Sequence, residues 1–414
     1  MSRFPRTLLA AATAGTLTFA VAACGSDEDS GGGGGDCEGT GMTVGTILPQ
    51  TGSLAFLGPP EFAGVDLAIE EINAAGGVLD ECVEAIHEDS GDTSTDIASQ
   101  SADSLIAQDV DAVVGAASSG VSFQFIDKLY EEGIVQISPA NTSPDFTTYE
   151  RGDYYFRTAP SDVLQGRVLA DQVIADGHES VAILALQDSY GTGLADAVEE
   201  NILEFGGEVV MKTIYDPNAT EFSAEVSELA EADADAVVLI TFNEITNLAP
   251  ELVQGNLGPQ DLGWYFVDGN LSNYGDEFPE GMLEGTKGTL PGADPSSLEE
   301  RLLEVDPELE DYSYAAESYD ATTLLALAAA AGGAYDSETI KENMIAVSRD
   351  GTECTDYASC VELLDAGEDI DYNGASGPIE FSAEGDVSAA TIGVYEYGAD
   401  NTYTNVSYNE QSLE

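Results

Sequence analysis

Basic residues are scarce in this sequence. Only 11 Lys and Arg stand against 78 Asp and Glu among 414 residues, a formal net charge of −67, and the acidic residues are spread along the chain. Such a surface repels nucleic acid and anionic lipid headgroups, so we exclude both as partners. Carboxylates repel one another most at low salt, where the Debye length grows to about 30 Å at 0.01 M. We interpret the surface as an adaptation to a saline environment, with a neutral role in solubility as the alternative.

Catalytic motifs are also lacking. The chain has two histidines, His87 and His178, and no Ser or Cys motif is placed to pair with either. It contains no G-x-S-x-G, no Walker string and no G-x-G-x-x-G, and the GTG at 191–193 lacks the rest of the last pattern. Acidic residues are too abundant for any pair to indicate a glycosidase. We therefore predict that the protein is not an enzyme and that it needs no cofactor. We expect both histidines to be hydrogen-bonded within the protein or exposed to solvent.

Only one apolar run approaches the length of a membrane span, and it lies at the N-terminus. Residues 7–23 are rich in Ala and Leu, follow two arginines and end in VAAC. The run is shorter than the roughly 20 residues of a transmembrane helix, so we predict a signal peptide over 1–23. VAAC resembles the lipobox of bacterial lipoproteins, in which the Cys, here Cys24, is diacylated. A plain secretory signal is the alternative.

Glycines follow the predicted lipidation site. Residues 24–40 include a GGGGG run, and Gly-rich segments behave as flexible coil. We expect a tether that holds the body at the outer face of the cytoplasmic membrane, with the lipid as the only membrane contact. Loss of the two arginines of the signal peptide would change the formal charge to 9 − 78 = −69.

Four cysteines remain after Cys24. An even number in an exported chain favours disulfides. Four cysteines allow three connectivities, and proximity in sequence favours Cys37 to Cys82 and Cys354 to Cys360. A zinc site is the alternative, but neither histidine has ligand spacing to these cysteines, so we predict no metal site.

The body alternates β-rich runs with amphipathic helical stretches, and it does so twice. The first series of expected strands is 42–48, 82–87, 111–115 and 134–138, with helices at 61–73, 95–108 and up to 132. The second series has strands at 181–186, 208–212, 236–241 and 264–268, with helices at 164–176, 194–205 and 221–230. A helix at 315–331 and strand material around 391–398 follow. This rhythm predicts an α/β fold with two doubly wound parallel sheets.

A chain of this length is too long for one ordinary core, so we expect two lobes. The extended segment YYFRTAPSD at 154–162 is the best hinge candidate. We expect lobe 1 to comprise residues 41–160 and 292–382, and lobe 2 to comprise 161–291 and 383–414.

Small polar residues follow the predicted strands, where open α/β sheets bind ligands. Ser118 and Ser119 lie between a strand and a helix, whose free N–H groups suit a carboxylate. An ordinary Ser N-cap is the alternative. Asn141 and Thr142 in SPANTSP repeat the pattern.

Six segments together make the sequence similar to a known family. They are TGSLAFLG at 51–58, EINAAGGV at 71–78, VVGAASSGVS at 113–122, EEGIVQISPANTSP at 131–144, FRTAPSDVLQG at 156–166 and DSYGTGLAD at 188–196. In this order and spacing they resemble the leucine/isoleucine/valine-binding protein family. The resemblance implies a type I periplasmic binding fold, in which two Rossmann-like lobes joined by three crossovers hold a ligand in the cleft between them.

The resemblance also implies a ligand site. Ser119, Thr142 and the backbone of Ala140 match the groups that hold the ligand carboxylate. Asp268, in FVDGN, aligns with the acidic partner of the ligand ammonium, where the family normally has the longer Glu. A solvated turn acid is the alternative for Asp268.

Four aromatic residues and one leucine complete this implied site. Tyr190 and Tyr314 match cleft aromatics, with lobe core as the alternative. Phe242 falls where the family has Tyr, so a hydroxyl is lost. Leu57, with Phe56 beside it, matches the wall that the TGSLAFLG loop provides.

The family implies a function. We expect a monomeric, extracytoplasmic solute-binding lipoprotein of an ABC importer, which closes on a branched-chain or related amino acid and delivers it to permease subunits. A ligand sensor that presents its closed state to a membrane receptor is the alternative. Relatives on this fold also bind amides, urea and small or aromatic acids.

Overall fold

The computed structural model describes residues 37–150 and 152–412. The predicted signal peptide, Cys24 and the tether up to residue 36 lie outside the described residues. Within the two described ranges, no helix combines the length and the apolar character that crossing a bilayer requires.

The first sheet has five parallel strands in the order β2-β1-β3-β4-β5. Their bounds are Thr40–Leu48 (β1), Cys82–Asp89 (β2), Ala112–Gly115 (β3), Val135–Ser138 (β4) and Tyr155–Arg157 (β5). Every residue of β3 and β4 is buried, as expected for parallel strands that are covered on both faces.

Helices cover both faces of this sheet. They are α1 (Gly58–Ala74), α2 (Ile97–Ala107), α3 (Ser119–Ser122) and α4 (Ile126–Glu132), with the short 3-10 helices η1 (Ala55–Leu57), η2 (Pro144–Thr148) and η3 (Gly152–Tyr154). Along the sheet, the connection from β1 to β2 runs in one direction, and the connections from β2 to β3 and from β3 to β4 run in the opposite direction. Right-handed crossovers therefore place α1 on one face and α2 with α4 on the other, and α2 contacts α4. The helix expected to run unbroken to residue 132 is interrupted between α3 and α4.

The second sheet has seven strands in the order β15-β14-β10-β9-β8-β6-β7. Their bounds are Ser180–Leu186 (β6), Glu208–Tyr215 (β7), Ala236–Ile240 (β8), Gly263–Phe266 (β9), Lys287–Pro291 (β10), Ala389–Tyr397 (β14) and Tyr403–Ser412 (β15). The expectation of a second purely parallel sheet is wrong, because β14 pairs antiparallel with both β10 and β15. In β15 exposed residues outnumber half-buried ones, so it lacks the apolar run that marks a buried parallel strand.

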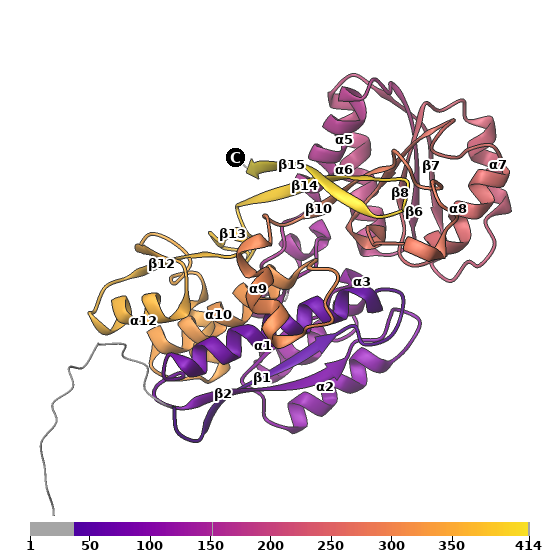
Figure 1. The fold of residues 1–414 in the computed structure, drawn as a ribbon. Helices are drawn as coiled ribbons and strands as arrows, with labels where there is room; N and C mark the ends of the chain where they lie inside the picture. The colour runs from indigo at the N-terminus through magenta and orange to yellow at the C-terminus, as the bar shows by residue number, and fades with distance from the viewer. Residues whose placement is uncertain (1–36, 151, 413–414) are drawn as a thin grey trace, which may run out of the picture. The chain divides into compact units, whose positions relative to one another are not determined.

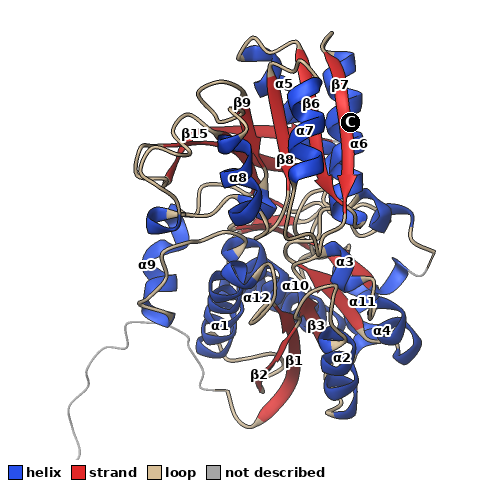
Figure 2. Cartoon of the chain, turned by 90° about the vertical axis from the view of Figure 1, so that its right-hand side faces the viewer, coloured by secondary structure: helices blue, strands red, loops and turns tan. Residues whose placement is uncertain are grey.

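The helices of the second sheet are α5 (Asp162–Ala175), α6 (Ser189–Glu204), α7 (Ser223–Glu231) and α8 (Ile245–Gln254), with η4 (Asp268–Asn270) and η5 (Gly275–Glu277). The same handedness rule places α6 on one face and α7 with α8 on the other. Contacts of α5 with α6 and of α7 with α8 agree with this arrangement (Figure 2).

The chain passes between the two sheets three times, after β5, after β10 and before β14. Between the last two passages lie α9 (Ser296–Val305), α10 (Ala315–Gly332), α11 (Ser337–Met344), α12 (Tyr357–Asp365) and the small sheet of β11 (Thr352–Cys354), β12 (Ile370–Gly374) and β13 (Gly377–Pro378). Figure 1 shows α10 beside α1, which it contacts. The two helices approach each other closely at Gly64. A Cβ atom at this position would lie 2.2 Å from the carbonyl oxygen of Ala315, so the approach requires glycine.

Both predicted disulfides are confirmed. Cys37 is bonded to Cys82 with a Cα–Cα distance of 5.1 Å, and Cys354 to Cys360 with 5.3 Å. The first ties the start of the described chain to β2, and the second ties β11 to α12.

Candidate functional site

The candidate ligand residues follow strands at the points where strand order reverses. In the first sheet β1 lies between β2 and β3, so the crevice at the carboxyl ends opens between the loop after β1 and the loop after β3. Leu57 comes from the former and Ser119 from the latter. In the second sheet the corresponding strands are β6 and β8, which are followed by Tyr190 and Phe242.

The structure brings these residues together. Leu57, Ala140, Tyr190, Phe242 and Tyr314 belong to one buried apolar cluster. Phe56 is half-buried and packs against this cluster, while Ser119, Thr142 and Asp268 are buried polar residues. Residues separated by more than 250 positions in sequence thus converge on one region.

The loops after β3 and β4 are joined by the amide of Asn141. Its Nδ2 donates to the carbonyl oxygens of Ala116 and Ala117 at 2.9 and 2.8 Å, and its Oδ1 accepts from the Tyr155 hydroxyl at 3.0 Å. These bonds satisfy buried backbone groups and fix the position of Thr142, the next residue.

Thr142 and Ser119 present hydroxyls in this joined region. The Oγ1 of Thr142 is buried next to the Asp162 carboxylate, whose pKa it lowers, but no described residue meets it with good hydrogen-bond geometry. The Oγ of Ser119 accepts a bond from the Ser143 N–H at 3.3 Å. The N–H of Ala140 is engaged with Ser138 Oγ at 3.3 Å. The two hydroxyls are therefore the groups best able to bind a ligand carboxylate here.

The predicted helix start at Ser119 is correct, but the helix is short. Ser118 is its N-cap and accepts from the Val121 N–H at 3.4 Å, and α3 ends at Ser122. A helix of four residues has little aligned dipole. The N-cap alternative thus describes Ser118, and Ser119 would act through its hydroxyl.

Asp268 is the centre of a buried hydrogen-bond network. Its Oδ1 accepts from Gln165 Nε2 and from the Tyr190 hydroxyl, each at 2.8 Å, and its Oδ2 accepts from the Tyr314 hydroxyl at 2.9 Å. Burial raises the pKa of Asp268 even though these three donors lower it. The shorter side chain of Asp is sufficient to reach both tyrosines, so the alternative of a solvated turn acid is wrong.

Asp162 is a second carboxylate in this region, and sequence reasoning placed it only in the hinge candidate. It is fully buried at the start of α5, its N–H donates to the Thr142 carbonyl at 2.7 Å, and neither carboxylate oxygen has a partner among the described residues. Burial raises its pKa well above the ordinary value, the Asp268 carboxylate raises it further, and the neighbouring Thr142 hydroxyl and Arg157 lower it.

No Lys or Arg forms an ion pair with Asp162 or Asp268 in the described part of the chain. The nearby Arg157 is completely buried, and its guanidinium is engaged with Asp386 at 2.6 Å and with the carbonyl of Ser143 at 2.8 Å. Two buried carboxylates without a paired cation are costly. The region is therefore suited to a cationic group supplied by a ligand.

Aromatic rings form one wall of this region. Tyr190 and Phe242 are stacked with ring centroids 5.4 Å apart and an interplanar angle of 10°. The Tyr190 hydroxyl accepts from the Gly269 N–H at 3.3 Å and is thereby aligned toward Asp268. Phe242 contributes only an apolar ring face, because it lacks the hydroxyl that a Tyr would have at this position.

Comparison with known proteins identifies the family. A family model described as periplasmic binding protein matches residues 41–398. The chain belongs to the periplasmic binding protein family. It is 32% identical over 315 residues to Leu/Ile/Val-binding protein homolog 1 of Brucella suis, covering 73% of this chain and 82% of the relative. A shorter alignment, 34% identical over 199 residues, covers 47% of this chain and about half (53%) of Leu/Ile/Val-binding protein homolog 3 of Brucella melitensis.

A third relative has a different stated role. The chemotactic signal transduction system substrate-binding protein of Halobacterium salinarum is 27% identical over 359 residues, which cover 83% of this chain and 84% of the relative.

Two solved structures show the fold of this periplasmic binding protein. The branched-chain amino acid transporter substrate binding protein of Streptococcus pneumoniae, in complex with isoleucine, has a TM-score of 0.73 at 22% identity, covering 90% of this chain and 100% of that chain. The solute binding protein of an ABC transporter from R. palustris, in complex with benzoate, has a TM-score of 0.71 at 18% identity, covering 90% and 98%. The type I periplasmic binding fold with two lobes is thereby confirmed.

The histidines of this periplasmic binding protein lie in ordinary structural contacts. His87 in β2 contacts Thr46 Oγ1 through Nδ1 at 2.9 Å and Asp66 through Nε2 at 3.1 Å. His178 packs edge-on against Tyr265. Within the described ranges no group of His, Cys, Asp and Glu is arranged to hold a metal ion.

Proposed function

We propose that this protein is the solute-binding component of an ABC importer and that its ligand is an amino acid with an apolar side chain. The observation that carries the proposal is the pair Asp162 and Asp268, two buried carboxylates with no ion-pair partner among the described residues. A ligand ammonium would supply the missing cation, because buried charges are tolerated only when they are paired.

The remaining groups suit the other ends of such a ligand. The hydroxyls of Ser119 and Thr142 would hold the ligand carboxylate, because charge-assisted hydrogen bonds to an anion are strong. Leu57, Phe56 and Phe242 would contact the apolar side chain, since small-molecule sites are mostly apolar with a few oriented polar groups. Tyr190 and Tyr314 would position Asp268 through the hydrogen bonds described above.

The proposed mechanism is binding by lobe closure, without catalysis. Lobe 1 would comprise residues 41–160 and 292–382, and lobe 2 residues 161–291 and 383–414, so that the three crossovers form the hinge. Ligand would shift the population toward the closed form, which a membrane permease would recognise. We propose a monomer that is anchored outside the membrane through lipidated Cys24 and carries an acidic surface adapted to salt.

A sensor is the second candidate function. The named role of the Halobacterium salinarum relative favours it, because that protein belongs to a chemotactic signal transduction system. Both functions require the same ligand site. Uptake of labelled ligand by vesicles carrying the neighbouring permease would support the importer, and ligand-dependent binding to a receptor without uptake would support the sensor.

Calorimetry with matched ligands tests the site. Leucine, 4-methylpentanoate, which is leucine without its amino group, and leucinamide, which lacks the carboxylate, should be titrated into the ligand-free protein together with benzoate. We expect leucine to bind and 4-methylpentanoate to bind at least a hundredfold more weakly, because the carboxylate pair would remain uncompensated. Equal affinity for the two, or preferential binding of benzoate, would contradict the proposed ligand class.

A further inference from the structure

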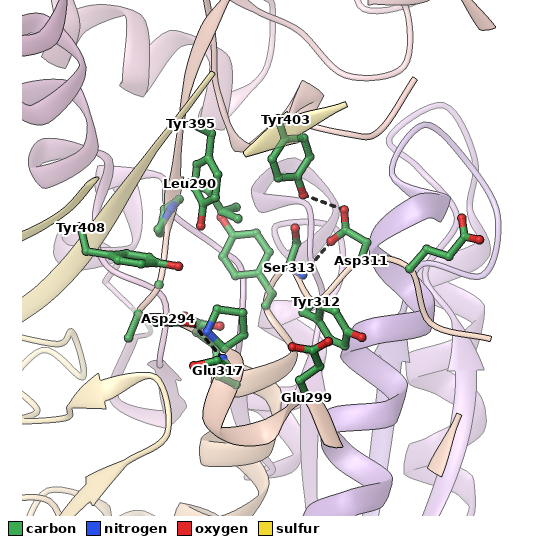
Figure 3. A pocket seen from close by; sticks show the side chains of 18 of the residues that line it. Leu290, Asp294, Glu299, Asp311, Tyr312, Ser313, Glu317, Tyr395, Tyr403 and Tyr408 are labelled. Atoms are coloured by element: carbon green, nitrogen blue, oxygen red, sulfur yellow. Dashed lines mark hydrogen bonds between the residues drawn. The ribbon is translucent and has the colours of Figure 1, made fainter. Parts of the chain in front are cut away.

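A cavity lies on the segments that connect the two sheets. Of the residues in the proposed amino-acid site, only Tyr314 lines it. The cavity has a volume of about 300 Å³ and is formed by the segment after β10, the segment before α10 and the last two strands (Figure 3). This volume is at the lower end of the range of small-molecule pockets, about 300 to 1,000 Å³.

Acidic and aromatic side chains line this cavity. The carboxylates are Asp294, Glu299, Glu310, Asp311 and Glu317. The aromatic side chains are Tyr312, Tyr314, Tyr395, Tyr403 and Tyr408. No Lys or Arg is among the described residues that line it, so its electrostatic potential favours a cation.

The buried one of these carboxylates is Glu317, which is 3% exposed. Its own backbone N–H donates to its carboxylate, and no hydrogen bond reaches its side chain from another described residue. Its Oε1 faces Gly292, where a Cβ atom would come within 2.7 Å, so glycine at this position leaves room for the carboxylate at the cavity wall. Burial raises the pKa of Glu317 to about 8. A cation bound beside such a buried carboxyl group at a cavity wall would favour its ionised form.

The tyrosines suit an organic cation better than a metal ion. Two of them turn their hydroxyls to carboxylates, Tyr403 to Asp311 at 2.9 Å and Tyr314 to Asp268 at 2.9 Å, so these hydroxyls are already engaged. Figure 3 shows Tyr395, Tyr403 and Tyr408 around the cavity. Cages of aromatic rings bind quaternary ammonium groups through cation–π attraction. Within residues 37–150 and 152–412, no set of acidic side chains converges closely enough to hold a metal ion.

We propose that this cavity is a second ligand site, which binds a small organic cation of the quaternary ammonium class. Glu317 supplies the buried negative charge, and the tyrosine rings supply the faces that contact the methyl groups. Tyr408 is 37% exposed and lies at the rim, so it can be replaced with little effect on the core.

Calorimetry with choline tests this proposal. The protein is residues 24–414, in sodium chloride and without amino acid. The neutral isostere 3,3-dimethylbutan-1-ol is the matched ligand control. We expect choline to bind at least tenfold more tightly than the isostere. Glu317→Gln should weaken choline binding about tenfold or more, because it removes the buried charge.

Tyr408→Ala and Tyr408→Phe form a matched pair of variants that does not depend on the buried glutamate. Alanine removes the ring and should weaken choline binding about tenfold, whereas phenylalanine keeps the ring and should change it less than threefold. Asp261→Asn, an exposed residue before β9, is the charge control. Equal binding of the isostere, equal affinities of the two Tyr408 variants, or complete competition by an equal concentration of potassium chloride would overturn the proposal. Because no amino acid is present, these results are independent of the proposed importer function.

Discussion

Replacing Asp268 by Asn should change ligand affinity and protein stability in different directions. In the structure Asp268 accepts three hydrogen bonds, and burial nevertheless raises its pKa. A carboxyl whose pKa is raised on folding contributes stability that is lost as the pH rises through that pKa, so burial of Asp268 opposes folding at pH values above its ordinary pKa. The amide carries no charge and also removes the repulsion with Asp162. We therefore expect the melting temperature of the ligand-free variant to be no lower than that of the wild type.

The affinity should fall steeply. If a ligand ammonium pairs with Asp268 in the buried site, removal of the charge leaves that ammonium poorly compensated, which costs about 3 to 5 kcal/mol. At 1.4 kcal/mol per tenfold, the dissociation constant should rise by about a hundredfold to several thousandfold. Ser119→Ala should cost less, about 1.5 to 3 kcal/mol, because Thr142 still presents a hydroxyl to the carboxylate.

Calorimetry and thermal melts on the same samples separate these effects. Asp261→Asn in the turn before β9 is the matched control, because it changes the same charge at an exposed site of the same lobe. If Asp268→Asn lowered the melting temperature by several degrees and left leucine binding intact, Asp268 would be a structural acid and not the partner of the ligand ammonium.

Four further predictions concern the anchor, the disulfides, salt and pH. Cys24→Ser should release the protein from the membrane fraction, and unchanged membrane association would exclude lipid attachment at this residue. Cys82→Ala and Cys360→Ala should lower the free energy of unfolding by about 4 and about 2 kcal/mol, from the loop entropy of separations of 45 and 6 residues; equal denaturant midpoints with the wild type would contradict this. The melting temperature should rise from 0.05 M to 2 M sodium chloride, because a mature charge of −69 is screened, and a flat profile would argue against adaptation to salt. The free energy of unfolding should fall between pH 4.5 and about 8 as Glu317 is forced to ionise while buried, with a contribution from Glu317 of up to about 1.4 kcal/mol per pH unit. Burial shifts the neighbouring carboxyls of Glu61 and Asp320 in the same direction, so Glu317→Gln should reduce this slope without abolishing it, and an unchanged slope would refute the assignment.

The parallel strands could be predicted from the sequence because buried strands are continuous apolar runs. This holds for β6 and β8, which are buried almost throughout. The strands that the sequence did not predict are stabilised by interactions other than burial of an apolar run. Three-residue β5 contains Arg157, whose guanidinium is paired with Asp386, 229 positions later. The polar strand β15 is held by antiparallel pairing with β14. The distant partner of Arg157 leaves no local signal for β5, and the polar sequence of β15 hides a strand that pairs with its neighbour along the chain.

The candidate site, including Asp268, was predicted by resemblance and by the position of polar residues after strands, whereas the burial of Asp162, Glu61 and Glu317 was not. Asp162 begins α5, where an acidic residue ordinarily interacts with the helix N-terminus at the surface. Glu61 lies in the first turn of α1 and Glu317 in α10, and both are buried. An amphipathic pattern places acids on the solvent face. That rule fails for α10, because α1, α11 and α12 pack around it and most of its residues are buried.

The buried acids would give the proposed lobe closure a physical cause. Asp162 and Asp268 are buried by groups from both sides of the hinge, because Thr142 follows a strand of the first sheet and Tyr190 follows a strand of the second. In the proposed mechanism, closing the lobes without a ligand takes two carboxylates out of water and gains no ion pair, so closure without a ligand is unfavourable. A ligand ammonium reverses this balance because it binds strongly only where both carboxylates converge. The ligand therefore has differential affinity for the closed form, which is the requirement for shifting the population. An acid-rich surface adds to the repulsion at low salt, so ligand-induced closure should be easiest to observe at high salt.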